Sequence, residues 1–240
     1  MNTFTNHWPN LGAGLLEFIM RANDFLPQRG MPKIYVDMDG VLADFFSEYA
    51  KLAGITSGNW RDIPPAKTDP TLQKMVGTDF FARLPKFRTA DALINLVTRA
   101  KGFDAYRICS SPLRGDHENS EHQKRQWISK HLRPAPREII ITSNKAKYAV
   151  QSDGTPNVLI DDLRKNINAW EAAGGIGIKY QADEDSLSVV AKGLSHALDV
   201  IGGAAKHEKH EVKPDSNTAS NIIAQPTDTV AVDLNKKSEL

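Results

Sequence analysis

The sequence predicts an α/β protein whose core is a doubly wound, Rossmann-like parallel sheet of about five strands. Two observations predict it. Short runs of strand length alternate along the chain with longer segments of helical pattern, and these runs are largely apolar, as strands buried on both faces are. Right-handed crossover connections then place helices on both faces of the sheet. The expected strands are KIYVD, FDAYRICS, EIIIT, NVLID and GIGIKY, at 33–37, 103–110, 138–142, 157–161 and 175–180.

The expected helices of the core are segments in which apolar residues recur at helical spacing. They are ADALINLVTRAKG, SEHQKRQWISKHL, LRKNINAWEAAG and SLSVVAKGLSHALDVIG, at 90–102, 120–132, 163–174 and 186–202. Together with the strands they define a core domain over 31–202.

A longer segment separates the first strand from the helix at 90–102. It holds about 45 residues, which is more than a simple connection needs. FFSEYAKLAGI and TLQKMVGTDFFARLP carry weak helical patterns on either side of the proline-rich NWRDIPPAK. We therefore expect a small, mainly helical cap at about 45–86, inserted over one end of the sheet.

The two ends of the chain differ from this core. Residues 1–30 form an N-terminal extension in which LGAGLLEFIM predicts a short amphipathic helix, ended by LPQRGMP. From residue 203 the chain becomes rich in small and polar residues, so 203–240 is expected to be a disordered tail. Its His207 and His210 belong to a solvated polar run rather than to a metal site.

The composition is that of a soluble globular protein, with 40% apolar and 25% charged residues in 240. A net charge of +1 does not indicate binding to a nucleic acid polymer or to a membrane surface. No apolar run approaches the roughly 20 residues of a membrane helix. The single cysteine, Cys109, excludes an intramolecular disulfide and fits a reducing compartment. We expect a cytoplasmic protein; a homodimer stays open.

Polar residues gather where the predicted strands end. Asp37 and Asp39 follow the first strand, and Ser110 and Ser111 end the second. Lysines follow the third strand in TSNKAK, and a pair of aspartates ends the fourth in LIDD. Ligands of open α/β sheets bind beyond the carboxyl ends of the strands, so these groups are expected to meet at one edge.

Clustered carboxylates repel one another unless a cation joins them. Aspartates at one edge therefore predict a hard, oxygen-binding cation, and Mg²⁺ suits a site that also takes substrate phosphate. Hydroxyls and a lysine can hold the phosphate oxygens. One carboxylate can attack phosphorus, and a second can protonate the leaving oxygen and later activate water.

The motifs DMDGVLADF, ICSSP, NK and LIDD resemble, in order and approximate spacing, those of the haloacid dehalogenase (HAD) superfamily of phosphotransferases, over roughly 33–180. DMDGVLADF with SSPL, WISKHL and LIDD is most similar to its 5'(3')-deoxyribonucleotidases. The resemblance implies a HAD-type fold in which Asp37 is the nucleophile and Asp39 the general acid and base. It places the phosphate-binding hydroxyl on Ser110, with Ser111 beside it.

The resemblance also implies the remaining ligands of phosphate and metal. The phosphate-binding lysine falls on Lys145, with Lys147 as an alternative in register. Metal binding falls on Asp37, the backbone carbonyl of Asp39, and the pair Asp161 and Asp162. We expect Asp162 to be the direct ligand and Asp161 a water-mediated or orienting one.

Aromatic residues of the cap segment are candidates for stacking on a nucleotide base. The resemblance points to Phe45, Phe80 and Phe81, with Trp60 as a further candidate; the alternative is that they only pack the cap onto the core. Relatives often carry a basic residue after the aspartate pair, where this chain has Leu163. That departure leaves the base selectivity open.

These residues together predict a Mg²⁺-dependent phosphomonoesterase that hydrolyses nucleoside monophosphates, deoxyribonucleotides foremost, through an aspartyl-phosphate. One alternative keeps the chemistry and changes the substrate to another small phosphomonoester, such as a sugar phosphate. Another is a non-catalytic nucleotide-binding scaffold.

Overall fold

The computed structural model describes residues 30–57 and 59–208. Five parallel strands form one sheet in the order β3-β2-β1-β4-β5. They are β1 (Ile34–Val36), β2 (Arg107–Ser110), β3 (Ile139–Ile141), β4 (Val158–Asp161) and β5 (Ile176–Lys179). The doubly wound α/β fold expected from the sequence is confirmed.

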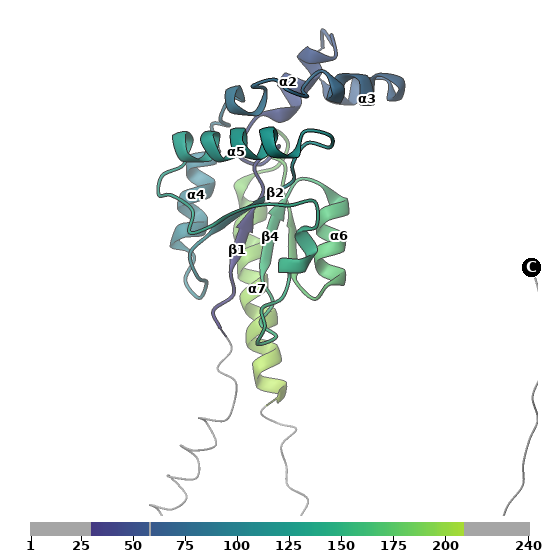
Figure 1. The fold of residues 1–240 in the computed structure, drawn as a ribbon. Coiled ribbons are helices and arrows are strands. Elements are labelled where there is room, and N and C mark those ends of the chain that lie inside the picture. The colour runs from purple at the N-terminus through teal and green to yellow at the C-terminus, as the bar shows by residue number, and fades with distance from the viewer. Residues whose placement is uncertain (1–29, 58, 209–240) are drawn as a thin grey trace, which may run out of the picture.

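Helices cover both faces of the sheet (Figure 1). They are α4 (Ala90–Arg99), α5 (His117–His131), α6 (Arg164–Ala172) and α7 (Leu187–Glu208). Successive side chains of β1 point to opposite faces of the sheet. Ile34 and Val36 belong to the larger apolar cluster, with residues of α4, α5 and α7, whereas Tyr35 belongs to a smaller one with Trp170 of α6.

Segment 45–86 lies beyond the carboxyl ends of the strands, at the top of Figure 1. It contains α2 (Phe45–Leu52), α3 (Pro65–Gln73) and two 3-10 helices, η1 (Trp60–Asp62) and η2 (Phe81–Arg83). Its two connections to the core run side by side, since Asp44 N–H donates to the Pro85 carbonyl at 2.8 Å and Phe87 N–H to the Leu42 carbonyl at 2.9 Å. We call this segment the cap.

Several element bounds differ from those expected. The second strand begins at Arg107 rather than at 103, and α5 begins at His117 rather than at 120. In the cap, the second helix begins at Pro65, inside the proline-rich stretch, because proline is well suited to the first turn of a helix. The last helix does not end at 202 but continues to Glu208, through the start of the expected tail.

The expected N-terminal helix in LGAGLLEFIM, the site of His210 and the rest of the expected tail lie outside the described residues. Within the described residues, no helix has the length and hydropathy needed to cross a membrane.

Candidate active site

The candidate residues follow strands that are neighbours in the sheet. The register pairs Val36 of β1 with Ile108 of β2 on one side and with Ile160 of β4 on the other. Asp37 follows β1 directly, and its backbone N–H donates to the Ile160 carbonyl at 2.9 Å. The residues at the ends of β1, β2 and β4 therefore meet at one edge of the sheet, beneath the cap.

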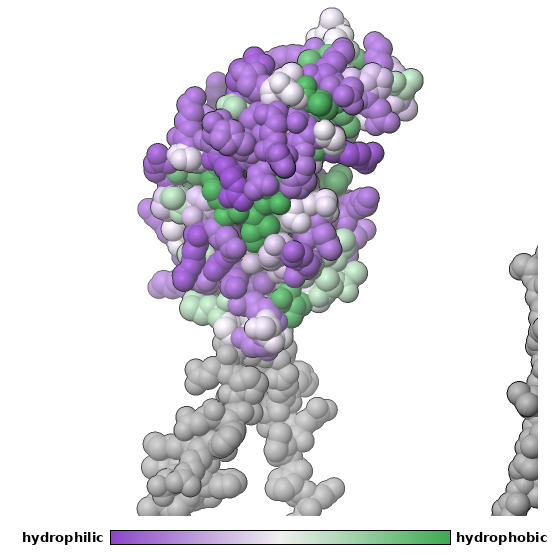
Figure 2. Space-filling view, in the orientation of Figure 1, coloured by the Kyte–Doolittle hydropathy of each residue, from purple (hydrophilic) through white to green (hydrophobic). Residues whose placement is uncertain are grey.

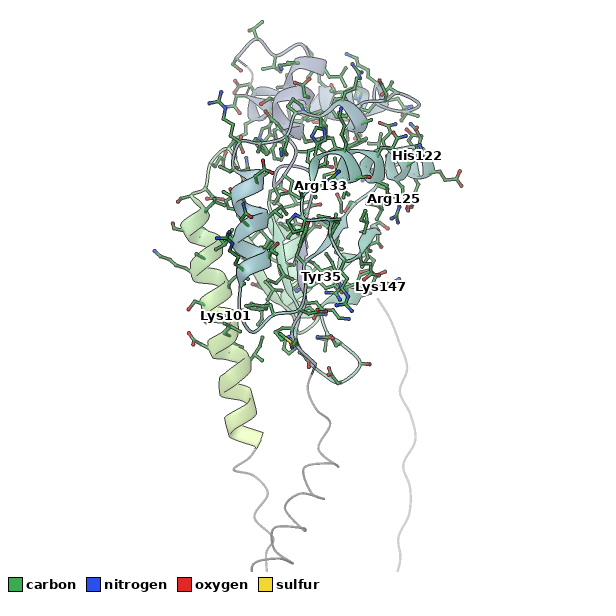
Figure 3. All side chains as sticks on the ribbon, turned by 90° about the vertical axis from the view of Figure 1, so that its left-hand side faces the viewer. Tyr35, Lys101, His122, Arg125, Arg133 and Lys147 are labelled. Atoms are coloured by element: carbon green, nitrogen blue, oxygen red, sulfur yellow. The ribbon has the colours of Figure 1, made fainter. Side chains whose placement is uncertain are left out.

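Three carboxylates form an acidic cluster, which consists of Asp37, Asp161 and Asp162. Each offers one oxygen within 4.8 Å of those of the others. The buried Lys145 joins them, with Nζ 2.8 Å from Asp37 Oδ2 and 2.6 Å from Asp161 Oδ2. Lys147 is exposed instead, its Nζ 5.1 Å from a tyrosine ring centroid, and Figure 3 shows it well away from the cap. Of the two lysines, Lys145 is the one in the site.

The charges of the acidic cluster do not balance. Burial and then the charge of Asp37 raise the pKa of Asp161. Burial, together with the charges of Asp37 and Asp161, raises the pKa of Asp162 to about 8. Burial alone would lower the pKa of Lys145, but the carboxylates of Asp37 and Asp161 outweigh it and raise that pKa. One lysine faces three carboxylates, so a cation would relieve the remaining repulsion.

The two aspartates at the end of β4 have different surroundings. Asp161 Oδ1 accepts hydrogen bonds from the Leu163 N–H at 2.8 Å and from Asn166 Nδ2 at 3.0 Å, while its Oδ2 accepts from Lys145. Among the described residues, no protein group donates a hydrogen bond to the Asp162 carboxylate. The cluster therefore fits a divalent cation, with Asp162 open to it and Asp161 already fixed in orientation.

Gly40 leaves the room that this cluster needs. Its φ of +72° lies in the left-handed region, which side chains rarely adopt. A Cβ at this position would lie 2.7 Å from the Phe46 ring and 2.9 Å from Asp162 Cγ. A glycine is thus required both by the backbone turn after Asp39 and by the close approach of Asp162.

Asp39 stands slightly apart from the cluster and has its own cation. Its Oδ2 is hydrogen-bonded and ion-paired to Nζ of Lys124, a fully buried side chain of α5. Its Oδ1 is buried and has no hydrogen-bond partner in the described part of the chain. Burial raises the pKa of Asp39 against the opposing charge of Lys124, and the charge of Asp37 adds to the rise. One oxygen is held, and the other is available for a proton.

Lys124 lies in the site although it belongs to none of the motifs in the sequence. Its Nζ also lies 3.1 Å from Ser110 Oγ and 4.6 Å from the centroid of the Phe81 ring. One feature of the sequence could have indicated that Lys124 is buried. Trp127 and Ile128 follow it by three and four residues, so all three lie on the same, buried face of α5. His122 and Arg125, which are close to Lys124 in the chain and labelled in Figure 3, are exposed.

The two serines at the end of β2 occupy different places. Ser110 is fully buried, and its Oγ contacts Lys124. Ser111 lines both cavities of the site. Of the two serines to which the resemblance points, Ser111 is therefore the one that reaches the cavities, and Ser110 is buried.

Two cavities lie beside Asp39, and one of them reaches the acidic cluster. The cap cavity, of about 510 Å³, lies between the cap and the residues after β2. The acidic cavity, of about 440 Å³, contains Asp37 and Asp162 together with polar side chains from beyond β4 and β5. The two cavities have four lining residues in common, which are Asp39, Phe45, Ser111 and Leu163.

The aromatic candidates take up different positions around these cavities. Phe45 lines both, and Phe81 lines the cap cavity although it is only 3% exposed. Phe80 lines neither cavity; it packs edge-on against Phe45, with ring centroids 5.8 Å apart. Trp60 lines the acidic cavity and stacks on Phe46 at 4.7 Å. The structure thus brings Phe45 and Phe81, but not Phe80, to the cavity that Asp39 and Ser111 also line.

A comparison with known protein families identifies the family of this chain. Residues 31–187 match the family described as 5' nucleotidase, deoxy (pyrimidine), cytosolic type C protein (NT5C). The chain belongs to the NT5C family. The match includes β1, the cap, the strand ends with all the acidic residues, and Lys124 and Lys145.

Solved structures similar to this NT5C member are haloacid dehalogenase-type hydrolases. A haloacid dehalogenase-like family hydrolase from Xanthomonas campestris is 14% identical, with a TM-score of 0.49, over 75% of this chain and 96% of that one. A HAD family hydrolase from Deinococcus radiodurans, solved with phosphate and sodium, is 16% identical, with a TM-score of 0.42, over 73% and 98%. No curated protein sequence matches the chain.

The family settles the class of chemistry. The protein is a phosphomonoester hydrolase of the NT5C nucleotidase family, with a candidate acidic metal site at Asp37, Asp161 and Asp162.

Proposed function

We propose that this protein is a Mg²⁺-dependent 5'-nucleotidase that hydrolyses nucleoside monophosphates, deoxyribonucleotides foremost, through an aspartyl-phosphate. The observation that carries the proposal is the acidic cluster with Lys145: Asp37 and Asp162 of the cluster line the acidic cavity, and this cavity shares Asp39 and Ser111 with the cap cavity. Family membership supports the nucleotide as substrate.

Asp37 is the nucleophile in this proposal. Its Oδ1 accepts the Met38 N–H at 2.7 Å and its Oδ2 pairs with Lys145, so both oxygens are oriented. Attack of a carboxylate oxygen on phosphorus forms the Asp37–phosphate bond and breaks the bond to the nucleoside oxygen. Lys145 then lies beside the transferred group and offsets its charge.

Asp39 moves the proton in both steps. The rise in its pKa favours the protonated form that can supply a proton to the departing nucleoside oxygen, and its unpartnered Oδ1 is the atom that can deliver that proton. In the second step Asp39 takes a proton from water as that water attacks the phosphorus. The Asp37–phosphate bond breaks, inorganic phosphate leaves, and Asp37 is restored.

The metal fits the donor set of this chain. The carboxylates of Asp37 and Asp162 and the backbone carbonyl of Asp39 would hold Mg²⁺, with Asp161 orienting the site through Lys145 and Asn166. When bound, Mg²⁺ supplies positive charge to the phosphoryl oxygens. Ser111 and Ser110 provide hydroxyls at the other side of the phosphate position.

The nucleoside occupies the cap cavity. Asp39 and Ser111 are polar residues of its lining, and Phe45, Phe81 and Leu72 supply apolar walls. Base–aromatic stacking contributes about 1–3 kcal/mol per base and tolerates different bases. A volume of about 510 Å³ is in the range of small-ligand sites. We place the reaction in the cytoplasm, in keeping with the word cytosolic in the family description.

A sugar phosphate is the second candidate, because the acidic cavity also contains Asn166, Lys179 and Gln181, which suit a hydroxyl-rich leaving group. Phosphate release should be measured from deoxyribonucleotides, ribonucleotides and sugar phosphates, each with Mg²⁺ and with EDTA. Mg²⁺-dependent release, fastest from the deoxyribonucleotides, is expected. Faster release from sugar phosphates would make a sugar phosphate the substrate in place of a nucleotide. Release of phosphate from no compound of the panel would leave only a nucleotide-binding scaffold.

A further inference from the structure

Leu163 is a large apolar side chain that stands in the site without being buried. It is 51% exposed and lines both cavities. The other large apolar side chains of the described residues that are clearly exposed line neither cavity; they are Met31, Val189, Leu198 and Val200. The face of the molecule in Figure 2 is mainly hydrophilic, with smaller apolar areas. An exposed leucine next to Asp162 therefore calls for a reason.

Local structure does not supply that reason. Leu163 is the N-cap of α6, and its side chain makes no capping hydrogen bond. Serine, threonine, aspartate and asparagine are preferred at this position, because a side-chain oxygen can accept a free N–H of the first turn. The apolar contacts of α6 with the core come from Ile167 and Trp170 instead. Such a conflict between a residue and its local structure is expected at functional positions.

The backbone of Leu163 is held firmly in place. Its N–H donates to Asp161 Oδ1 at 2.8 Å, and its carbonyl accepts the Asn166 N–H at 2.9 Å. The Cα–Cβ bond of Leu163 therefore keeps its direction relative to the acidic cluster. Besides Leu163, one apolar residue lines both cavities, and that is the half-buried Phe45. The other two residues common to both linings are Asp39 and Ser111.

We propose that Leu163 determines substrate specificity: with Phe45 it forms an apolar collar at the junction of the cavities, which selects phosphomonoesters whose leaving group presents a broad apolar face. This inference rests on the proposed function, in which the leaving nucleoside enters the cap cavity. A nucleoside that covers Leu163 removes its exposed apolar surface from water. A small, hydroxyl-rich leaving group would lose hydrogen bonds to water against the same surface.

The test compares kcat/KM for two substrates in the full-length protein with Mg²⁺. One is a deoxynucleoside 5'-monophosphate, and the other is glycerol 3-phosphate, whose leaving group is small and polar. Leu163→Ala should lower the ratio of kcat/KM, nucleotide over glycerol phosphate, about tenfold, as the loss of a few buried methyl and methylene groups does. Leu198→Ala, at an exposed leucine of α7 outside both cavities, is the matched control and should leave the ratio as it is.

Leu163→Ser separates specificity from folding. Serine can cap α6, so this variant should melt at or above the temperature of the unaltered protein and still show the tenfold fall in the ratio. An unchanged ratio in both Leu163 variants, in a protein that does hydrolyse nucleotides, would overturn the inference and leave the proposed function standing. Failure of the unaltered protein to hydrolyse any nucleotide would instead overturn the proposed function, and the inference with it.

Discussion

Lys124→Met tests the buried contact between α5 and Asp39. The Lys124 side chain is fully buried and that of Asp39 is 23% exposed, so the variant leaves a largely buried carboxylate oxygen without its cation. Removing one partner of a buried ion pair costs about 3–5 kcal/mol. Because Asp39 retains some access to water and can take up a proton, we expect a loss near the lower limit, about 3 kcal/mol. An Asp39 that is no longer held should also lower kcat by at least about 100-fold, the low end of general acid–base catalysis.

Urea unfolding and steady-state kinetics on the same variants measure both effects. The matched control is Arg125→Met, since Arg125 is the next residue of α5, is exposed, and forms a salt bridge with the partly exposed Glu121. This variant should change the free energy of unfolding by less than about 1 kcal/mol. If the unpaired carboxylate causes the loss, Asp39→Asn added to Lys124→Met should restore part of the stability. Lys124→Met with near-normal stability and kcat within tenfold of the unaltered protein would refute the reasoning.

Two further predictions concern the acidic cluster and the turn beside it. Gly40→Ala should lower the free energy of unfolding by about 1–3 kcal/mol and reduce activity, because φ at this position is +72° and the new Cβ would lie 2.9 Å from Asp162 Cγ. Urea unfolding measures the loss of stability. The control for backbone strain alone is Gly77→Ala, since Gly77 also has a positive φ but its Cβ would have no atom within 4 Å. Mg²⁺ should bind more tightly as the pH rises toward 8, because the pKa of Asp162 is raised to about 8 and the metal must displace that proton. Calorimetry near pH 6 and pH 8 measures this, and an affinity that is flat between them, or steeper in Asp162→Asn, would count against the assignment.

The sheet could be read from the sequence because each strand is a short apolar run, and the convergence of the acidic residues followed from parallel strands ending at one edge. Asp37 and Asp161 meet for that reason. The start of β2 was placed too early because Phe103 and Tyr106 are apolar and buried but precede the ladder, which begins at Arg107. Burial, rather than strand pairing, accounts for the apolar pattern there.

The parts of the site that the sequence did not reveal depend on side-chain direction. A lysine on a polar helix is ordinarily exposed, so the burial of Lys124 becomes visible only when α5 is packed over the strand ends. Likewise, Ser110 and Ser111 are adjacent in the chain but point to different surroundings, one to Lys124 and the other to the cavities. The exposure of Leu163 follows from its place at the start of α6, which no pattern of apolar residues encodes.

The central claim is that Asp37 carries the phosphoryl group during turnover. Acid quenching of the protein with Mg²⁺ and a deoxyribonucleotide in the first turnover, followed by mass spectrometry of the peptides, tests it most directly. We predict one added phosphoryl group on Asp37, absent from Asp37→Asn and absent when EDTA replaces Mg²⁺. Rapid hydrolysis with no phosphoryl group on the protein, or with the group on another residue, would contradict the account.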